Sequence, residues 1–121
     1  MNKIIWVDDE IDLLKPHVMF LQGKGYEVDT CNNGYDAVEM ISSTAYDLVI
    51  LDEMMPGMTG LETLPLIKAE RPSLPVIMVT KSEEGIAEVR WLGGESLIEA
   101  LKISYATIKQ VVERYTRKRL L

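Results

Sequence analysis

Residues 48–60 read LVILDEMMPGMTG, an apolar run that ends in an acidic residue. The run from Leu48 to Leu51 is continuous rather than alternating, which is typical of a strand covered on both faces in a parallel sheet. We therefore predict a buried strand here, with Asp52 just past its carboxyl end.

Three further apolar runs lie on either side of this one, at residues 4–7, 28–31 and 76–79. Segments with helical spacing separate the runs, marked by Leu13, Leu14, Val18 and Leu21, then Ala37, Val38 and Ile41, then Leu61, Leu64 and Ile67. Pro65 is expected to kink the third helix or loosen its first turns. Strands that alternate with helices at this spacing predict an α/β fold with a doubly wound parallel sheet.

The segment after Thr80 allows more than one prediction. Residues 82–84 (SEE) favour the opening of a helix, and Gly93 with Gly94 favours its end. Beyond that point, residues 97–102 form a fifth strand in one interpretation. In the other, residues 95 to about 117 form one long helix, whose heptad seam is Ile98, Leu101, Tyr105, Ile108, Val112 and Tyr115. Local propensities favour the long helix.

The composition fits one soluble globular domain over residues 1–121. Within it, residues 1–84 follow the alternating pattern of strands and helices, and residues 85–121 are an atypical portion that departs from this pattern. The single Cys31 cannot form an internal disulfide, which favours a reducing compartment. No apolar run is long enough to span a membrane, and the N-terminus lacks a secretory pattern. We therefore expect a cytoplasmic protein that does not bind membranes.

The net charge of −6 is distributed unevenly. Residues 1–84 carry 6 Lys and Arg against 15 Asp and Glu, whereas residues 85–121 carry 7 against 4. The acidic body disfavours nucleic acid as a partner. We interpret the basic end, Arg114 with residues 117–119, as a solvated helix face suited to the negative end of the helix dipole.

Acidic residues follow two of the predicted strands. Asp8 and Asp9 come after the first apolar run and Asp52 after the third. Ligands of open parallel sheets bind outside the carboxyl ends of the strands, so these carboxylates should converge there. A cluster of carboxylates persists where a cation binds among them, and oxygen-only ligands favour Mg²⁺ or Mn²⁺ over zinc.

Each of these residues also has a structural interpretation. A single Asp after a strand is usually a helix cap or turn residue, but a pair after one strand and another after a second favours a site. Thr80 closes the fourth apolar run at the same sheet edge, where a Thr is commonly structural but its hydroxyl would point into the crevice. His17 lies in the first helix, where we expect a surface or packing residue.

Residues 7–10 (VDDE), 48–60 and 75–80 (PVIMVT) together resemble the receiver domains of two-component response regulators. The resemblance runs from Asn2 to about Glu84, and its specific part is the Asp that ends an apolar strand, with Met-Pro three residues further on and then Gly. It implies a flavodoxin-like (CheY-like) three-layer sandwich.

The same resemblance implies roles for individual residues. Asp52 would be the phosphoacceptor, and Asp9 and Asp52 would bind Mg²⁺ through their side chains. Asp8 would orient the ion through water, and the carbonyl of Met54 would complete its shell. Thr80 would hydrogen-bond the phosphoryl oxygens. The donor would be a phosphohistidine on a sensor histidine kinase, and the output a protein or domain outside these residues.

The last third of the chain departs from the receiver pattern. Lys102 falls near the family's distance after Thr80, but Ile103 follows it where receivers have Pro, and Glu99 stands where they have an aromatic residue. Lys102 is therefore either the phosphoryl counter-ion or an exposed residue of a long helix. Residues 85–121 are a native receiver end, a diverged one or a fused segment.

Four functions can be weighed on these residues. The first is a phosphorylatable signalling switch, which is not a turnover enzyme. The second is an interaction scaffold with impaired or lost phosphorylation, forming a homodimer through its C-terminal helix. A Mg²⁺-dependent phosphohydrolase would need an acid–base Asp where Met54 stands. A flavodoxin-like cofactor binder would need a Gly- or Ser-rich phosphate loop after the first strand, and none is present.

Overall fold

The computed structural model of the chain describes residues 3–81 and 87–91, with side chains up to residue 78. These residues form a five-stranded sheet in the order β2-β1-β3-β4-β5. The strands are β1 (Lys3–Val7), β2 (Glu27–Cys31), β3 (Leu48–Asp52), β4 (Val76–Lys81) and β5 (Ala87–Trp91). The first four run parallel to one another, as predicted.

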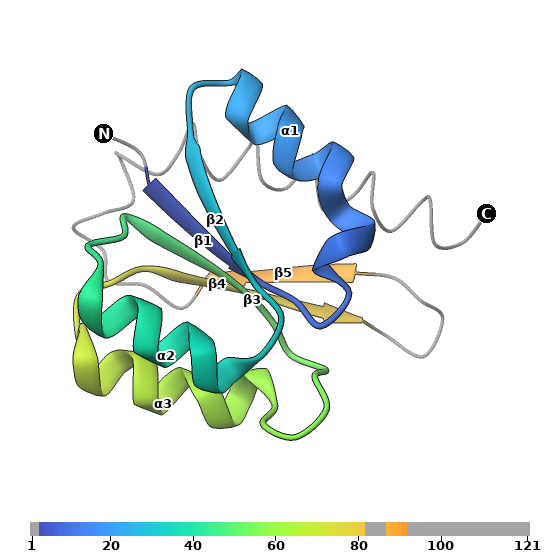
Figure 1. The fold of residues 1–121 in the computed structure, drawn as a ribbon. Coiled ribbons are helices and arrows are strands. Elements are labelled where there is room, and N and C mark those ends of the chain that lie inside the picture. Colours follow the sequence, from blue (N-terminus) through green and yellow to red (C-terminus); the bar gives the residue numbers. More distant parts are fainter. Residues whose placement is uncertain (1–2, 82–86, 92–121) are drawn as a thin grey trace.

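Helices cover both faces of this sheet (Figure 1). A 3₁₀ turn, η1 (Ile11–Leu14), leads into α1 (Lys15–Gly23) on one face. The helices α2 (Gly34–Ser43) and α3 (Gly60–Glu70) lie side by side on the other. Among the residues that the structure describes, no helix combines the length and the hydrophobicity that crossing a bilayer requires.

The core consists of one apolar cluster on each face of the sheet. On the α1 face, Trp6, Ile50 and Ile77 pack with helix residues such as Leu21. On the opposite face, the strand residues Ile5, Val7, Val49 and Leu51, whose side chains point the other way, form a cluster with residues of the helices. These helix residues are Ala37 and Ile41 of α2 and Ile67 of α3. Every residue of β3 is buried, which confirms the prediction drawn from its continuous apolar run.

Side-chain caps fix where α2 and α3 begin. The Asn33 side chain accepts a hydrogen bond from the backbone N–H of Asp36 at the start of α2. At α3, the Thr59 hydroxyl accepts from the N–H of Glu62, whose carboxylate accepts from the N–H of Thr59. Pro65 lies inside α3, and the helix runs through it without a break.

The segment after β4 differs from the prediction. The sequence predicts a helix that begins at residues 82–84, but residues 87–91 form β5, which pairs antiparallel with β4. The sequence AEVRW alternates apolar and polar residues with the two-residue period of a strand, and this pattern outweighs the helix-opening signal before it. Lys102, the two interpretations of residues 95–117 and the C-terminal helix as a dimer contact lie outside the described residues.

Candidate functional site

The acidic residues are placed by two neighbouring parallel strands. Val7 of β1 is in register with Leu51 of β3, so Asp8 and Asp52, one residue further along each strand, reach the same edge of the sheet. The backbone N–H of Asp8 also donates to the carbonyl oxygen of Cys31, at 3.0 Å, which ties this edge to the end of β2. The carboxyl ends of three strands therefore build one side of the site.

Three carboxylates meet at this edge. One oxygen from each of Asp8, Asp9 and Asp52 lies within 4.8 Å of the other two. Asp8 and Asp52 are 3% and 1% exposed, whereas Asp9 is open to solvent. The predicted convergence of these residues is confirmed, and the roles assigned to them stay predictions.

This donor set fits a hard divalent cation. Oxygens that bind one ion at ~2.1–2.5 Å lie at most ~4–5 Å apart, which matches the spacing of the three carboxylates. Two of the carboxylates are buried, and buried like charges are costly unless an opposite charge compensates them. His17 is also buried, in α1, and is not part of this group.

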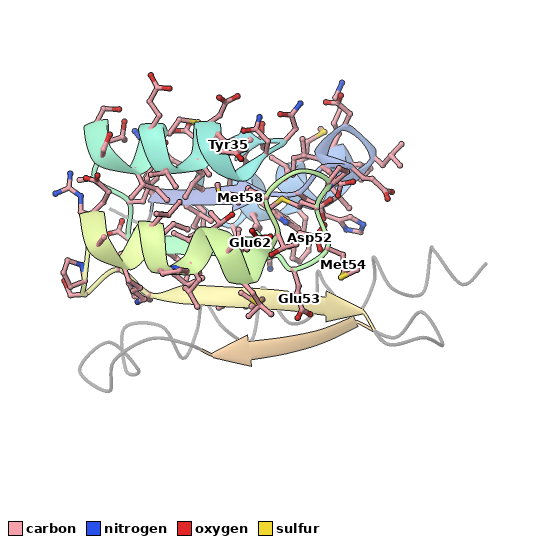
Figure 2. The ribbon with its side chains drawn as sticks, turned by 90° about the horizontal axis from the view of Figure 1, so that it is seen from below. Tyr35, Asp52, Glu53, Met54, Met58 and Glu62 are labelled. Atoms are coloured by element: carbon pink, nitrogen blue, oxygen red, sulfur yellow. The ribbon has the colours of Figure 1, made fainter. Side chains whose placement is uncertain are left out.

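Backbone N–H groups orient two of the carboxylates. Asp52 Oδ1 accepts from the N–H of Met54 at 3.2 Å, and Asp8 Oδ1 accepts from the N–H of Glu10 at 2.8 Å. Met54 itself has a side chain that is 64% exposed on the loop after β3 (Figure 2). The loop therefore holds the Asp52 carboxylate through its backbone and leaves the Met54 side chain to solvent.

Cys31 ends β2 at the same edge but is not poised to bind a metal. Its thiol donates to the carbonyl oxygen of Asn33 at 3.1 Å. Burial raises the pKa of the Cys31 thiol, an effect larger than the opposing hydrogen bonds. Cys31 is also not among the residues whose ligand atoms converge at this edge, so the donor set found among the described residues consists of oxygens.

Thr80 is brought to the site by its backbone. Asp52 is in register with Val79 of β4, so Thr80 lies one residue further along the neighbouring strand. The strand order therefore puts Thr80 at the sheet edge that carries the carboxylates, as predicted.

Gly60 is a site residue whose role was not predicted from the sequence. A Cβ atom at this position would collide with the carbonyl oxygen of Asp52 and lie 2.8 Å from the Cα of Glu53. The N–H of Gly60 also donates to the carbonyl oxygen of Glu53 at 2.9 Å. The first residue of α3 thus rests directly on the strand end that carries Asp52. A Gly just inside a capped helix start was the signal for such a close approach.

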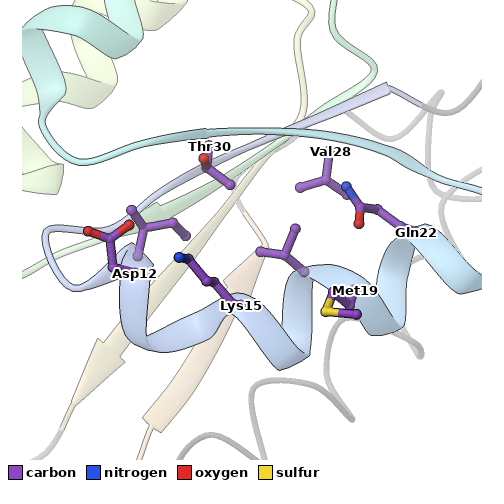
Figure 3. A pocket seen from close by; sticks show the side chains of 8 residues that line it. Asp12, Lys15, Met19, Gln22, Val28 and Thr30 are labelled. Carbon is purple, nitrogen blue, oxygen red and sulfur yellow. The ribbon is translucent and has the colours of Figure 1, made fainter.

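A groove lies between β2 and the η1–α1 segment, the segment that follows Asp8 and Asp9 in the sequence (Figure 3). Its volume is about 300 Å³, and its lining mixes apolar and polar side chains: Ile11, Asp12, Lys15, Val18, Met19, Gln22, Val28 and Thr30. Leu13 and Met19 of the same segment are 69% and 67% exposed. Large exposed apolar side chains of this kind are common at protein contact surfaces.

A comparison with protein families finds that the model described as "Response regulator receiver domain" matches residues 4–98. Among curated proteins, the transcriptional regulatory protein CpxR homolog of Haemophilus influenzae is 39% identical over 89 residues, which are 74% of this chain and 38% of the relative. ResD of Bacillus subtilis is 40% identical over 84 residues, 69% of this chain and 35% of the relative. The chain thus spans well under half the length of these relatives.

Solved structures agree with the family match. The response regulator TrrA of Thermotoga maritima, in complex with Mg²⁺ and BeF, has a TM-score of 0.65 at 34% identity, covering 84% of this chain and 97% of that one. A structure of the histidine kinase ThkA in complex with TrrA gives 0.63 at 36% identity, covering 80% and 78%. The chemotaxis protein CheY4 of Vibrio cholerae gives 0.63 at 32% identity, covering 68% and 70%.

Proposed function

Since this chain belongs to the response regulator receiver domain family of two-component systems, we propose that it is a switch in which Asp52 accepts a phosphoryl group beside a divalent cation. The observation that carries the proposal is the placement of Asp52. It is 1% exposed at the carboxyl end of β3 and lies within 4.8 Å of two other carboxylates. An acidic cluster with two buried carboxylates, at this edge of an open sheet, is suited to a cation and to a phosphoryl group that the cation neutralises.

The cation in this proposal is Mg²⁺ or Mn²⁺. Asp9 and Asp52 would hold it through carboxylate oxygens, Asp8 would orient it through water, and the Met54 carbonyl would add a further oxygen. When bound, the ion lowers the repulsion between the Asp52 carboxylate and the oxygens of the incoming phosphoryl group. The Met54 N–H, 3.2 Å from Asp52 Oδ1, keeps the carboxylate oriented.

The chemical step is a displacement at phosphorus. A carboxylate oxygen of Asp52 forms the new O–P bond as the P–N bond of a donor phosphohistidine breaks, and the imidazole leaves with the bonding electron pair. Catalysis of this step is positioning and charge neutralisation, so no further acid–base residue is needed. The Thr80 hydroxyl would then donate to a phosphoryl oxygen from the neighbouring strand.

A sensor histidine kinase is the proposed donor, and the η1–α1 segment is its proposed contact surface. This segment begins three residues after Asp8 and carries the exposed side chains of Leu13 and Met19. The position of this segment lets a kinase cover the exposed apolar side chains while the kinase's phosphohistidine reaches Asp52. The structural likeness to TrrA, which was solved with a histidine kinase, supports this proposal.

The output of the switch is proposed to be a protein or domain outside this chain. Phosphorylation replaces the single negative charge of the Asp52 carboxylate by up to two on the acyl phosphate, in a protein whose net charge is already −6. Such a change in charge, made at the ends of β3 and β4, can shift the equilibrium between two packing arrangements of the adjoining surface.

The experiment that tests the proposal is uptake of a phosphoryl group from acetyl phosphate in the presence of Mg²⁺. Wild type is compared with Asp52→Asn and with the control Asp47→Asn, the same substitution at the opposite end of β3. We expect uptake of one phosphoryl group by wild type and by Asp47→Asn, and none by Asp52→Asn. Uptake by all three proteins, or by none, would refute the role of Asp52.

A further inference from the structure

The strand β5 lies at an edge of the sheet. It pairs antiparallel with β4, and no described strand lies on its other side (Figures 1 and 2). An edge strand presents a row of backbone N–H and C=O groups that can pair with a strand of another chain. β5 is therefore a candidate contact surface at the end of the sheet opposite β2.

The residue order of β5 is complementary to itself. In a two-fold antiparallel pair centred on its middle residue, Val89 lies opposite its own counterpart. Glu88 then lies opposite the second copy's Arg90, and Arg90 opposite the second copy's Glu88. Opposite charges in directly facing positions stabilise a strand pair, whereas like charges in those positions destabilise it.

The other edge of the sheet lacks this property. In β2 (Glu27–Cys31) the middle residue is Asp29, so the same two-fold pairing would put two carboxylates directly opposite each other. The Asp29 carboxylate is moreover engaged by the Tyr46 hydroxyl at 2.6 Å. Charge complementarity thus distinguishes the two edges and selects β5 for contact between copies.

We propose that two copies of this chain associate through β5, so that their sheets join into one continuous sheet across a two-fold axis. The contact is isologous, because the same strand serves both partners. It also pairs an edge that no other described strand covers. The proposal concerns β5 alone and does not depend on phosphorylation, so it can fail while the role of Asp52 stands.

Charge reversal tests the proposed register on the full-length chain, with sedimentation velocity over a range of concentrations as the measurement. Glu88→Arg and Arg90→Glu each put like charges opposite each other at both ends of the pair. We expect each to raise the dissociation constant of the dimer at least tenfold, whereas the double variant Glu88→Arg/Arg90→Glu restores it. The control Glu39→Arg, on the exposed side of α2, should leave the constant unchanged.

A mixture of the two single variants gives a second, stricter readout. Glu88→Arg and Arg90→Glu are complementary to each other in the proposed register, so equimolar mixing should yield a heterodimer that neither variant forms alone. A wild-type protein that stays monomeric at all concentrations would overturn the proposal. A dimer that is insensitive to these charge reversals would also overturn it, since the copies would then associate through another surface.

Cross-linking tests the same pairing without a change of charge. In a Cys31→Ser background, Val89→Cys would bring two thiols together at the two-fold axis. Facing residues in antiparallel strands have Cα atoms ~4.5–5.5 Å apart, which a disulfide can bridge. Mild oxidation should give a covalent dimer, and Tyr35→Cys, at an exposed position on α2, should not. Equal cross-linking of both variants, or of neither, would contradict the proposal.

Discussion

Asp52 combines burial with close neighbours of its own charge. Its exposed fraction is 1%, and carboxylate oxygens of Asp8 and Asp9 lie within 4.8 Å of its own. The sequence predicted this convergence because it requires only that three acidic residues follow parallel strands that pair with each other. What it did not predict is how unequally the three residues are buried, since burial depends on the loops that close over each strand end.

The first prediction concerns the stability of the metal-free protein. Asp52→Asn removes one charge from the carboxylate cluster, so in EDTA the free energy of unfolding should rise by roughly 1–3 kcal/mol at an effective dielectric constant of ~20. Added Mg²⁺ should then stabilise wild type, through ligand binding to the folded state, and leave the variant nearly unchanged. Urea unfolding with and without Mg²⁺ measures both effects. A variant less stable than wild type in EDTA would show that the three carboxylates do not repel one another.

Gly60 shows which kind of site residue is hard to predict. Its importance comes from the approach of α3 to the end of β3, a tertiary contact between the Gly60 backbone and the strand end at Asp52 and Glu53. The types of residues in the sequence and the spacing between them do not reveal such a contact. The sequence offered only a glycine at a place where the backbone does not require one for its conformation.

The second prediction tests this contact. Gly60→Ala should lower the free energy of unfolding by about 2 kcal/mol, because the added methyl group forces α3 away from the strand end. It should also slow phosphoryl uptake, because the Asp52 backbone shifts with the helix. Gly23→Ala is the control, since a Cβ at that position meets no atom within 4 Å. Equal stability and equal uptake rates in both variants would argue against the contact.

At the scale of elements, the four parallel strands and the three helices between them were predictable, and β5 was not. Continuous apolar runs and helical spacing are strong local signals, and caps at Asn33 and Thr59 reinforce two of the helices. For residues 82–94, the signal for a helix start at residues 82–84 competed with residues 87–91, whose alternation of apolar and polar residues favours a strand. The structure has the strand because β4 offers an edge with which this alternating segment can pair.

A hydrogen bond between elements supplies the third prediction, a pH dependence. The Tyr46 hydroxyl, just before β3, donates to Asp29 Oδ2 on β2 at 2.6 Å. Burial, followed by the hydrogen bond to Asp29, raises the pKa of Tyr46 to about 12. An ordinary Tyr has a pKa of about 10, so the stabilisation is complete below pH 10 and is lost as the pH rises towards 12.

Comparison of wild type with Tyr46→Phe isolates this effect. The stability advantage of wild type should shrink by about 1 kcal/mol between pH 9 and pH 11, because the unfolded Tyr46 loses its proton first. Urea unfolding at the two pH values provides the measurement. A difference between the two proteins that stays constant over this range would show that Tyr46 titrates normally.

For the whole molecule, the change of charge and pattern after residue 84 falls within a single five-stranded sheet. The net-acidic portion, residues 1–84, contains the four parallel strands and the three helices between them, and the strand β5 in the next described segment was not predicted. The proposed phosphorylation site and the proposed dimer strand therefore lie on adjacent parts of one sheet. The carboxylates lie at the ends of β1 and β3, and β5 pairs with the strand that carries Thr80.

The most direct measurement is the location of the acyl phosphate. The protein is incubated with acetyl phosphate and Mg²⁺, treated with borohydride, which reduces an aspartyl phosphate to homoserine, and mapped by peptide mass spectrometry. We predict homoserine at position 52 alone, and only when a divalent cation is present. Homoserine at another aspartate, or its formation at position 52 to the same extent in EDTA, would contradict a cation-dependent phosphoacceptor at Asp52.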